Sequence, residues 1–515
     1  MNVPGFWRTA ETFPERIALI TDEGEAITYG AMGKRVNQLS HALLGAGLRH
    51  GDHLSLLMGN DPEWLEVYMA ALQVGLYFTP INFHLTATET AYIVDNSDAR
   101  MFIASADYAS VAQQTASQLN LGSNQLLSLG MIDGFTELKQ FIANQPDSPP
   151  KHRQVGSQML YTSGTTGHPK GVLRQIPEGP PELICNKSKH YAELYELNTD
   201  NGVQLITGPL YHAAPCANAI NSLNYGHSVI LMKKWAAERT LQLIEQHRVT
   251  DTHLVPIMFH RLLALPESVK THYDLSSLRF VMHGAAPCAA TTKHQMIDWL
   301  GPILWEYYGA TEGGGARISS QEWLQRPGSV GKPWTGSEIV ALDENDQPCP
   351  PNTPGILYMK STLGDFEYYK SEEKTAACYR DGYLTVGDVG YLDDEGYLFL
   401  SDRKIDMIIS GGVNIYPVEI EAVLVQHPSV ADVAVIGIPD EEWGESVKAI
   451  IELNGGINPS EQLTEEILAL AKNQLAKFKH PKSIEYINEL PRLITGKLYK
   501  RLLRDKYWKN QTRSM

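Results

Sequence analysis

The chain has 515 residues, of which 43% are hydrophobic and 20% are charged, a composition typical of a soluble globular protein. This length is too great for one compact core, so we expect at least two folding units. The formal net charge of −16 argues against nucleic acid or an anionic membrane surface as a main partner.

The cysteines and the N-terminus indicate the compartment. The five cysteines are odd in number and never in C-x-x-C spacing, which predicts free thiols in a reducing compartment and no zinc or redox site. Residues 1–14 have no apolar core of the kind that makes a signal peptide. No run approaches the ~18 apolar residues of a membrane span. We therefore expect a cytoplasmic protein with no integral membrane segment.

Helical and strand periods alternate from the start of the chain. Met32, Val36, Leu39 and Leu43 recur at helical spacing, and residues 53–58 read as a short buried strand. A helix is expected to begin at Pro62 with Asp61 as its cap, followed by another apolar run. The same alternation recurs at residues 76–81, 202–207, 252–265 and 278–282. It predicts an α/β fold of layered subdomains with largely parallel sheets.

A second, smaller domain is expected after a boundary near residues 401–406. A proline-initiated helix over 417–426 is followed by apolar strands over 430–438 and 447–453 and by a further helix around Ile467. This pattern predicts domains at 1–402 and 403–515. The tail is basic, because residues 472–515 contain 12 Lys/Arg against 3 Asp/Glu. A segment that faces phosphates and a solvated helix face both fit that charge.

Residues 161–171 give the sharpest local signal, Tyr-Thr-Ser-Gly-Thr-Thr-Gly-His-Pro-Lys-Gly. Glycines let the backbone approach an anion, successive N–H groups can cradle it, and Lys170 adds charge. The spacing is not that of a Walker A loop, since Gly171 follows Lys170. A flexible surface linker is the alternative, but the apolar residues on both sides argue against it.

This run resembles the phosphate loop of the adenylate-forming (ANL) superfamily, which includes acyl-CoA synthetases, luciferases and adenylation domains of peptide synthetases. Further motifs follow in the family order, and the resemblance extends over residues 30–503. It implies the ANL fold, a large N-terminal domain with ATP and acyl sites and a small mobile α+β domain. It also implies that the phosphates of ATP are bound by Thr162, Ser163, Gly164, Thr165, Thr166, Gly167 and Lys170.

The resemblance assigns the remaining nucleotide contacts. Residues 303–306 read as a strand, and Tyr308-Gly-Ala-Thr-Glu312 follows it. This motif resembles the element that stacks a tyrosine on adenine and places its Thr and Glu near the α-phosphate and Mg²⁺. Thr166 and Glu312 are then the residues nearest the metal, and both are also expected to serve catalysis. Asp388 resembles the aspartate that holds the ribose hydroxyls, and Arg403 the arginine that reaches ribose or phosphate. The other nucleotide-binding residues implied are Gly284, Ala285, Ala286, Pro287, Tyr307, Gly309 and Thr311.

The C-terminal motifs imply domain alternation. Lys497 resembles the catalytic lysine that bridges the substrate carboxylate and the α-phosphate. Gly411 and Gly412 resemble the loop that lines the pantetheine channel of coenzyme A. The hinge position of the family, usually Asp or Lys, is occupied here by Ile405. Nothing in the sequence establishes regulation by lysine acylation.

Small residues surround the expected acyl site. No aspartate lies between residues 210 and 223, so an α-amino acid is disfavoured as the substrate. His212 either serves catalysis, by gating the pocket or by contacting the carboxylate, or packs in the core. The small residues indicate a roomy apolar cavity for a fatty, aryl or bulky ring (steroid-type) acid, or close backbone packing; they are Ala213, Ala214, Ala219, Gly284, Gly309, Gly313, Gly314 and Gly315.

An ATP-dependent carboxylic acid–CoA ligase that acts through an acyl-adenylate is the favoured hypothesis. The chain ends soon after Lys497, so CoA is the expected acceptor and a separate carrier protein the alternative. A non-catalytic nucleotide-binding protein is the alternative from another class, but the charged motif residues are all present. A homodimer is compatible with the sequence.

Overall fold

The computed structural model describes residues 3–162, 169–360, 364–403, 406–410, 413–440, 443–492 and 498–508, and of residues 402, 403 and 414 the backbone alone. The chain divides into two compact units, each built from several segments. The first comprises residues 1–254, 265–282 and 364–377, and the second comprises residues 255–264, 283–363 and 378–515. The expected boundary between residues 402 and 403 stays a prediction.

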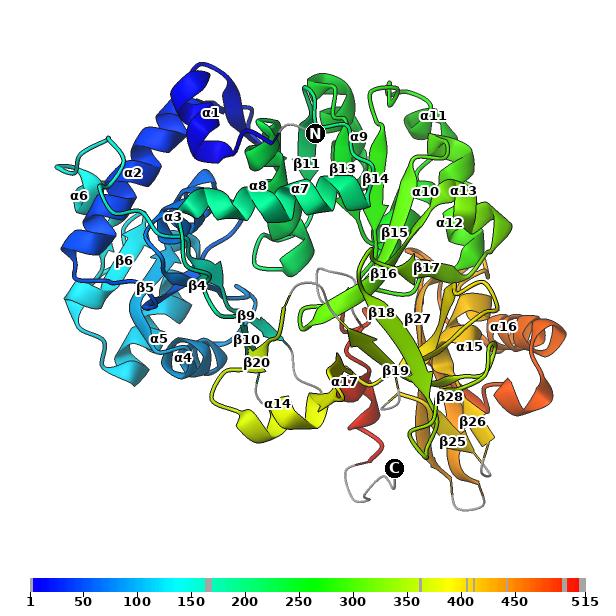
Figure 1. Cartoon of the computed structure of the whole chain (residues 1–515). Coiled ribbons are helices and arrows are strands. Elements are labelled where there is room, and N and C mark those ends of the chain that lie inside the picture. Colours follow the sequence, from blue (N-terminus) through cyan, green and yellow to red (C-terminus); the bar gives the residue numbers. More distant parts are fainter. Residues whose placement is uncertain are drawn as a thin grey trace. The chain divides into compact units, whose positions relative to one another are not determined.

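A parallel six-stranded sheet forms one layer of the first unit (Figure 1). Neighbouring residues on a strand point to opposite faces. Leu56 therefore packs in the cluster that includes α2 (Tyr29–Gly45) and α3 (Pro62–Gln73), and Leu57 in the cluster of α4 (Ala87–Asn96) and α5 (Ala109–Leu119). The strand order is β7 (Thr136–Glu137), β6 (Leu126–Leu129), β5 (Ala99–Ser105), β3 (His53–Leu57), β4 (Tyr77–Pro80) and β8 (Ser157–Gln158).

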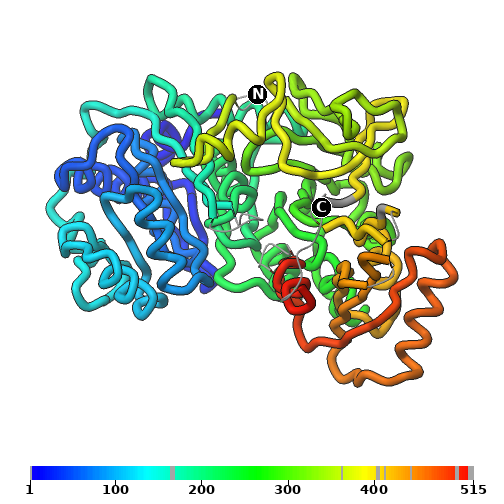
Figure 2. The backbone as a smooth tube through the Cα atoms, turned by 90° about the horizontal axis from the view of Figure 1, so that it is seen from below, coloured from blue at the N-terminus to red at the C-terminus, as the bar shows by residue number. Residues whose placement is uncertain are grey.

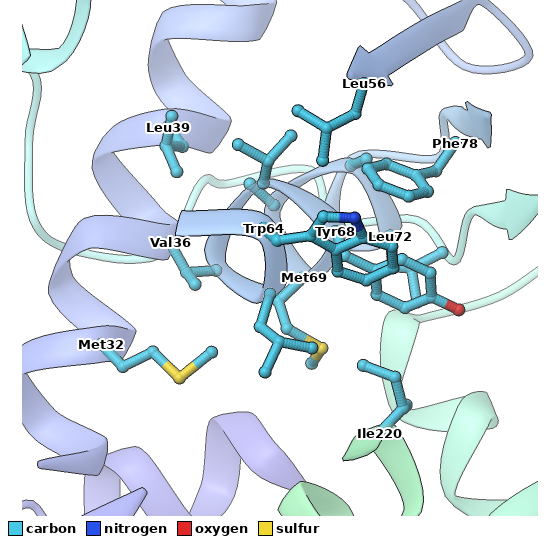
Figure 3. Close-up of a cluster of buried hydrophobic side chains, with 14 of the residues drawn as sticks. Met32, Val36, Leu39, Leu56, Trp64, Tyr68, Met69, Leu72, Phe78 and Ile220 are labelled. Atoms are coloured by element: carbon cyan, nitrogen blue, oxygen red, sulfur yellow. The ribbon is translucent and has the colours of Figure 1, made fainter. Parts of the chain in front are cut away.

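The core between this sheet and its helices is aromatic as well as aliphatic. Trp64 is 1% exposed and stacks on Tyr68, with ring centroids 5.6 Å apart. Phe78 of β4 meets both rings edge-on, and the apolar stripe of α2 packs in the same cluster (Figure 3). Each such buried side chain contributes about 1.5–3 kcal/mol relative to exposure. The helical spacing predicted for residues 32–43 is confirmed.

In a second sheet of the first unit, the edge strand β2 (Ala26–Thr28) is antiparallel to its neighbour, and the next three strand pairings are parallel. Its order continues as β1 (Ile17–Thr21), β12 (Ser228–Leu231), β11 (Val203–Ile206), β13 (Asp251–Leu254) and β14 (Phe280–His283). The unit's other long helices are α1 (Phe6–Thr12), α7 (Ile184–Leu194), α8 (Ala213–Tyr225) and α9 (Ala237–His247).

A small antiparallel sheet completes the first unit. It joins β9 (Leu160–Thr162) and β10 (Lys170–Leu173) to β20 (Glu367–Tyr368), a strand from a distant part of the chain. β20 is followed by α14 (Glu372–Cys378).

The second unit is antiparallel in its first part, unlike the largely parallel sheets expected. Short hairpins join many of these strands, so no crossover helix is needed. The accompanying helices are α10 (Pro256–Leu263), α12 (Ala290–Leu300) and α13 (Ser320–Gln325). The order is β15 (Leu304–Ala310), β16 (Gly313–Ser319), β17 (Ser329–Pro333), β24 (Leu398–Arg403), β23 (Asp388–Leu392), β19 (Gly355–Lys360), β22 (Tyr383–Leu384) and β21 (Tyr379–Arg380), with β18 (Glu338–Leu342) beside β19.

The last part of the chain has its own sheet and core, and its orange-to-red trace gathers together in Figure 2. Along β27 (Val430–Asp440), Val435 packs with α15 (Pro417–Leu424) and α16 (Glu461–Gln474), whereas Ile436 packs with α17 (Lys500–Arg504). The remaining strands are β25 (Ile408–Ser410), β26 (Val413–Ile415), β28 (Gly444–Leu453) and β29 (Ser483–Ile487).

Two local expectations have different outcomes. Pro62 occupies the start of α3 as predicted, but Asp61 makes no side-chain capping hydrogen bond. In the described ranges, no helix combines the length and the apolar character needed to cross a membrane.

Candidate active site

The stem of the predicted phosphate loop is a two-stranded ribbon. Thr162 lies opposite Lys170 in the register of β9 and β10. The ammonium of Lys170 lies 4.5 Å from the ring centroid of Tyr368, a cation–π distance. β20, which pairs with β10, thus contributes the aromatic ring that contacts Lys170. The loop residues Ser163, Gly164, Thr165, Thr166 and Gly167 lie outside the described residues.

The loop after β14 lies close to Tyr307. A Cβ atom on Gly284 would be 2.6 Å from the ring and the carbonyl of Tyr307, so only glycine fits there. Ala285 has φ 67°, a left-handed conformation that costs an alanine about 1–2 kcal/mol. Such strain at a loop is typical of a functional site.

A buried ion pair fixes this loop relative to the next strand. Lys293 of α12 is 0% exposed, and its Nζ lies 2.6 Å from the carboxylate of Glu306 in β15. The side chain of His283 lies 3.8 Å from the same carboxylate. α12 follows the loop 284–287, and β15 carries Tyr307. The ion pair between Lys293 and Glu306 therefore connects the two elements that are expected to contact adenine.

The Tyr308–Glu312 motif forms a β-hairpin. The strand expected to end at residue 306 continues to Ala310, so Tyr307, Tyr308 and Gly309 lie on β15. Thr311 and Glu312 form the turn, and Glu312 is 8% exposed. A Cβ on Gly315 would approach the Tyr308 carbonyl to 2.4 Å, which explains why the opposing strand needs a glycine.

The predicted adenine and ribose residues touch one another. The hydroxyl of Tyr308 donates to Oδ2 of Asp388 over 2.7 Å, in a buried hydrogen bond between residues 80 positions apart. Arg403 lies opposite Asp388 in the register of β24 and β23, and its side chain is outside the described residues.

These residues fit a magnesium nucleotide. An ionised carboxylate can accept bonds beyond the one from Tyr308, as two ribose hydroxyls require. Mg²⁺ is commonly held by one or two carboxylates plus phosphates, which suits Glu312 as a protein ligand. Among the described residues, no group of three or more His, Cys, Asp or Glu forms an all-protein metal site.

The residues expected around the acyl group have mixed environments. His212 is the N-cap residue of α8, with its ring 4.2 Å from that of Tyr211. Ala213 and Ala214 are half-buried in the first turn, whereas Ala219 is 0% exposed inside the core cluster. A Cβ on Gly314 would be 2.7 Å from Met359. Close packing accounts for Gly314, and the acyl roles of all these residues stay predictions.

Sequence reasoning missed the polar side chains that position α8 and the segment before it. The amide of Asn60 donates to the carbonyls of Gly208 and Met232, and its Oδ1 accepts from the N–H of Leu210. On α7, the hydroxyl of Tyr191 donates to Oδ1 of Asn218. A lone asparagine between a strand and a helix gives no signal in the sequence.

Burial disfavours the thiolate form of several cysteines. All five are free thiols. Burial raises the pKa of Cys216 to about 12, and the pKa of Cys288 is also well above its usual range because of burial.

The C-terminal motif residues Lys497, Gly411 and Gly412 lie outside the described residues, as does the hinge residue Ile405. Their flanks are described. Arg492 and Leu498 form a β-bridge across the gap, and Arg492 pairs with Asp432, with Nη2 2.7 Å from Oδ1. Ser410 lies opposite Gly444 where β25 meets β28.

Comparison with known proteins decides the family. Residues 6–369 match the AMP-binding enzymes, and residues 419–497 match the C-terminal domain of these enzymes. The chain belongs to the AMP-binding enzyme family. Like other AMP-binding enzymes of the adenylate-forming superfamily, it uses ATP and acts as an adenylate-forming ligase on a carboxylic acid.

Similar AMP-binding enzymes differ in acid and acceptor. Fatty acid–[acyl-carrier-protein] ligase ScoC of Streptomyces coeruleorubidus is 30% identical over 96% of this chain and 94% of its own length. Feruloyl-CoA synthase of an Amycolatopsis species is 33% identical over 98% and 99%. The crystal structure of the anthranilate CoA ligase AuaEII with anthranoyl-AMP has a TM-score of 0.84 at 26% identity, covering 98% of this chain and 97% of that one.

Proposed function

We propose that the protein is an AMP-forming acyl-CoA synthetase. A carboxylate oxygen of the acid attacks the α-phosphorus of ATP, and the bond to pyrophosphate breaks. The thiol of CoA then attacks the acyl carbon, the bond to AMP breaks, and the thiol proton passes to solvent. The observation that carries this proposal is the direct contact between Tyr308 and Asp388, because it joins the adenine-facing and ribose-facing residues beside Glu312.

The first half-reaction needs positioning and charge neutralisation more than covalent chemistry by the protein. Lys170 and the loop hydroxyls hold the β- and γ-phosphates, and Asp388 holds the ribose. Glu312 and Thr166 would hold Mg²⁺, which neutralises charge on the phosphates when bound. Lys497 aligns the carboxylate against the α-phosphate, where a cation stabilises the charge that develops.

The sequence of residues 210–223 bears on the acid class. Burying an ammonium group requires a carboxylate partner, and no aspartate lies between residues 210 and 223. A fatty, aryl or bulky ring acid therefore suits the site better than an α-amino acid. The names of relatives that act on fatty, feruloyl and succinylbenzoate groups support this range.

An exposed aromatic side chain supports CoA as the acceptor. Trp443 is 47% exposed at the β27–β28 turn, next to Gly444, the partner of Ser410. Lys482 lies 5.5 Å from its ring centroid. An indole beside an ammonium group fits a purine and a phosphate, which CoA carries. This surface adjoins Ser410, which directly precedes Gly411 and Gly412 in the sequence.

The test is to separate the two half-reactions in a Lys497→Ala variant. We expect adenylate formation from Mg·ATP and acid to fall about a hundredfold or more, because a charge that acts in the transition state is lost. Transfer from supplied acyl-adenylate to CoA should stay within about twofold. Mass spectrometry of acyl-AMP and acyl-CoA, after incubation with an acid panel, measures both steps.

Lys472→Ala is the matched control, because Lys472 is an exposed lysine in the last turn of α16. It should leave both steps unchanged. Equal loss of both steps in Lys497→Ala would contradict the division of labour. Acyl-AMP that the wild-type protein never converts to acyl-CoA would instead favour a carrier protein as the acceptor, as in the name of ScoC.

A further inference from the structure

Helix α4 contacts both ends of the phosphate loop. The hydroxyl of Tyr161, just before the loop, donates to Oδ1 of Asn96 over 2.7 Å. The hydroxyl of Tyr92 donates to the carbonyl of Pro169, just after the loop, over 3.2 Å. Tyr92 and Asn96 are four residues apart, so they lie on the same face of the helix, one turn from each other. One rigid helix thus spans the two stems.

The helix itself is firmly held. Thr86 and Glu89 form a reciprocal capping box at its start. The helix buries Ile93 and Val94, both 2% exposed, in a core cluster against which Tyr92 also packs. A support that is capped and packed in this way can transmit a fixed geometry to the loop.

The turn after α4 also holds the third strand of the small sheet. Asp98 accepts a hydrogen bond from the hydroxyl of Tyr369 over 2.7 Å and pairs with Lys370 over the same distance. These residues directly follow Tyr368, whose ring lies beside the ammonium of Lys170. The end of α4 therefore supports β9, β10 and β20 together.

Tyr161 keeps its proton at any working pH. Its ring is half-buried, and burial raises the pKa of Tyr161 far above its usual value. The neutral hydroxyl has a proton to donate to Asn96.

We propose that α4 is a positioning element for triphosphate binding, with Tyr92 and Asn96 as positioning residues that fix the separation of the two loop ends. The proposal rests on the proposed function, since it concerns the loop that binds ATP. Fixing both ends of a glycine-rich loop removes conformational freedom before the nucleotide arrives, so less is lost on binding. Neither residue needs to touch the substrate.

Three variants test the proposal in the full-length protein: Tyr161→Phe, Asn96→Ala and Tyr92→Phe. Each should weaken binding of a non-hydrolysable ATP analogue about fivefold, the equivalent of one net hydrogen bond. KM for ATP should rise in parallel, while KM for the acid stays unchanged. The Tyr161→Phe/Asn96→Ala double variant should bind the analogue as tightly as either single variant does, because the two substitutions remove the same hydrogen bond.

Tyr29→Phe is the matched control. Its hydroxyl donates to the carbonyls of His227 and Leu223, 2.7 and 3.0 Å away, inside the same unit. Removing the Tyr29 hydroxyl should lower thermal stability at least as much as the three test variants do, without changing nucleotide affinity. This control separates a positioning role from general destabilisation.

Amide hydrogen exchange gives a readout that needs no activity. In the three test variants, amides of residues 159–173 should exchange faster than in the wild-type protein. In the Tyr29→Phe protein, these amides should exchange at the wild-type rate. Unchanged exchange and unchanged affinity in all three variants would overturn the proposal. Additive losses in the double variant would overturn the Tyr161–Asn96 half. If the three variants lose affinity for the analogue as expected but the wild-type protein forms no adenylate, the proposed function is refuted and the positioning role of α4 stands.

Discussion

Tyr308 and Asp388 illustrate what single residues can reveal in a sequence. Motif order gave each of them a place at the nucleotide, because aromatic faces and carboxylates suit adenine and ribose. The hydrogen bond between them depends on β15 and β23 meeting in space, which no spacing encodes. Likewise, Gly284 and Gly315 suggested a cavity, but their missing Cβ atoms are required by neighbouring backbone.

Glu66 provides a prediction on the pH dependence of stability. It is 1% exposed, and burial raises its pKa to about 7, opposed by Arg35, whose Nε lies 2.9 Å away, and reinforced by the charge of Glu63. The folded protein therefore retains a proton that the unfolded chain releases above about pH 4.5. Stability from this group is present below pH 4.5 and falls by about 3 kcal/mol as pH rises to 7.

A Glu66→Gln variant lacks this titration. We expect the free energy of the first urea-unfolding transition, taken as variant minus wild type, to rise by about 3 kcal/mol from pH 4.5 to 8. Glu63→Gln is the control, because Glu63 lies on the same helix and contacts the same arginine but is more exposed. If the difference in unfolding free energy between Glu66→Gln and wild type stays constant from pH 4.5 to 8, Glu66 titrates as an ordinary carboxyl.

Elements were predictable where apolar periodicity is strong. The strands at residues 53–57 and 430–440 and the helix from Pro417 follow from their sequences. β20 could not be found in this way, since it is two residues long and its partner β10 lies about 200 positions earlier. The strand expected over residues 303–306 extends to Ala310, because hairpin pairing with β16 overrides the low strand propensity of glycine.

Asn60 links elements that carry the expected acyl site. Its side chain, 7% exposed, holds the segment between β11 and α8 through Gly208 and Leu210. Asn60→Ala leaves buried polar groups without partners, so we expect a loss of about 3 kcal/mol. Loosening of the segment before His212 should also raise KM for the acid more than KM for ATP.

Thermal unfolding and steady-state kinetics measure both effects of Asn60→Ala. Asn82→Ala is the control, because Asn82 accepts one exposed hydrogen bond from the N–H of His84. It should cost less than about 1 kcal/mol. An equal rise of both KM values in Asn60→Ala would mean that Asn60 stabilises the fold without positioning the acyl site.

At the scale of the whole molecule, the α/β class and the family were predictable, whereas the division of sheet types was not. Parallel strands require long crossovers, which the first unit's helices supply, and the alternation of strands and helices in the sequence reports them. In the second unit, residues 304–363 and 378–403 are rich in glycine and tyrosine, and short turns join several of their strands. Their antiparallel order depends on which distant strands pair, as β17 does with β24.

The proposed C-terminal domain, residues 403–515, should fold alone. Its sheet is covered on both faces: α15 and α16 pack on one face in a core that includes Val433 and Ile467, and α17 packs on the other. A sheet with both faces buried meets the requirement for an independent core. We expect the isolated segment to unfold in one cooperative thermal transition, followed by circular dichroism and calorimetry.

Core variants make that expectation specific. Ile467→Ala removes a side chain that is 0% exposed and should cost about 2–5 kcal/mol, whereas Ile457→Ala, at a position 38% exposed, should cost little. A broad, non-cooperative transition that neither substitution shifts would place the boundary elsewhere. The core of residues 408–508 would then depend on the rest of the second unit. This unit also contains residues 255–264, 283–363 and 378–407.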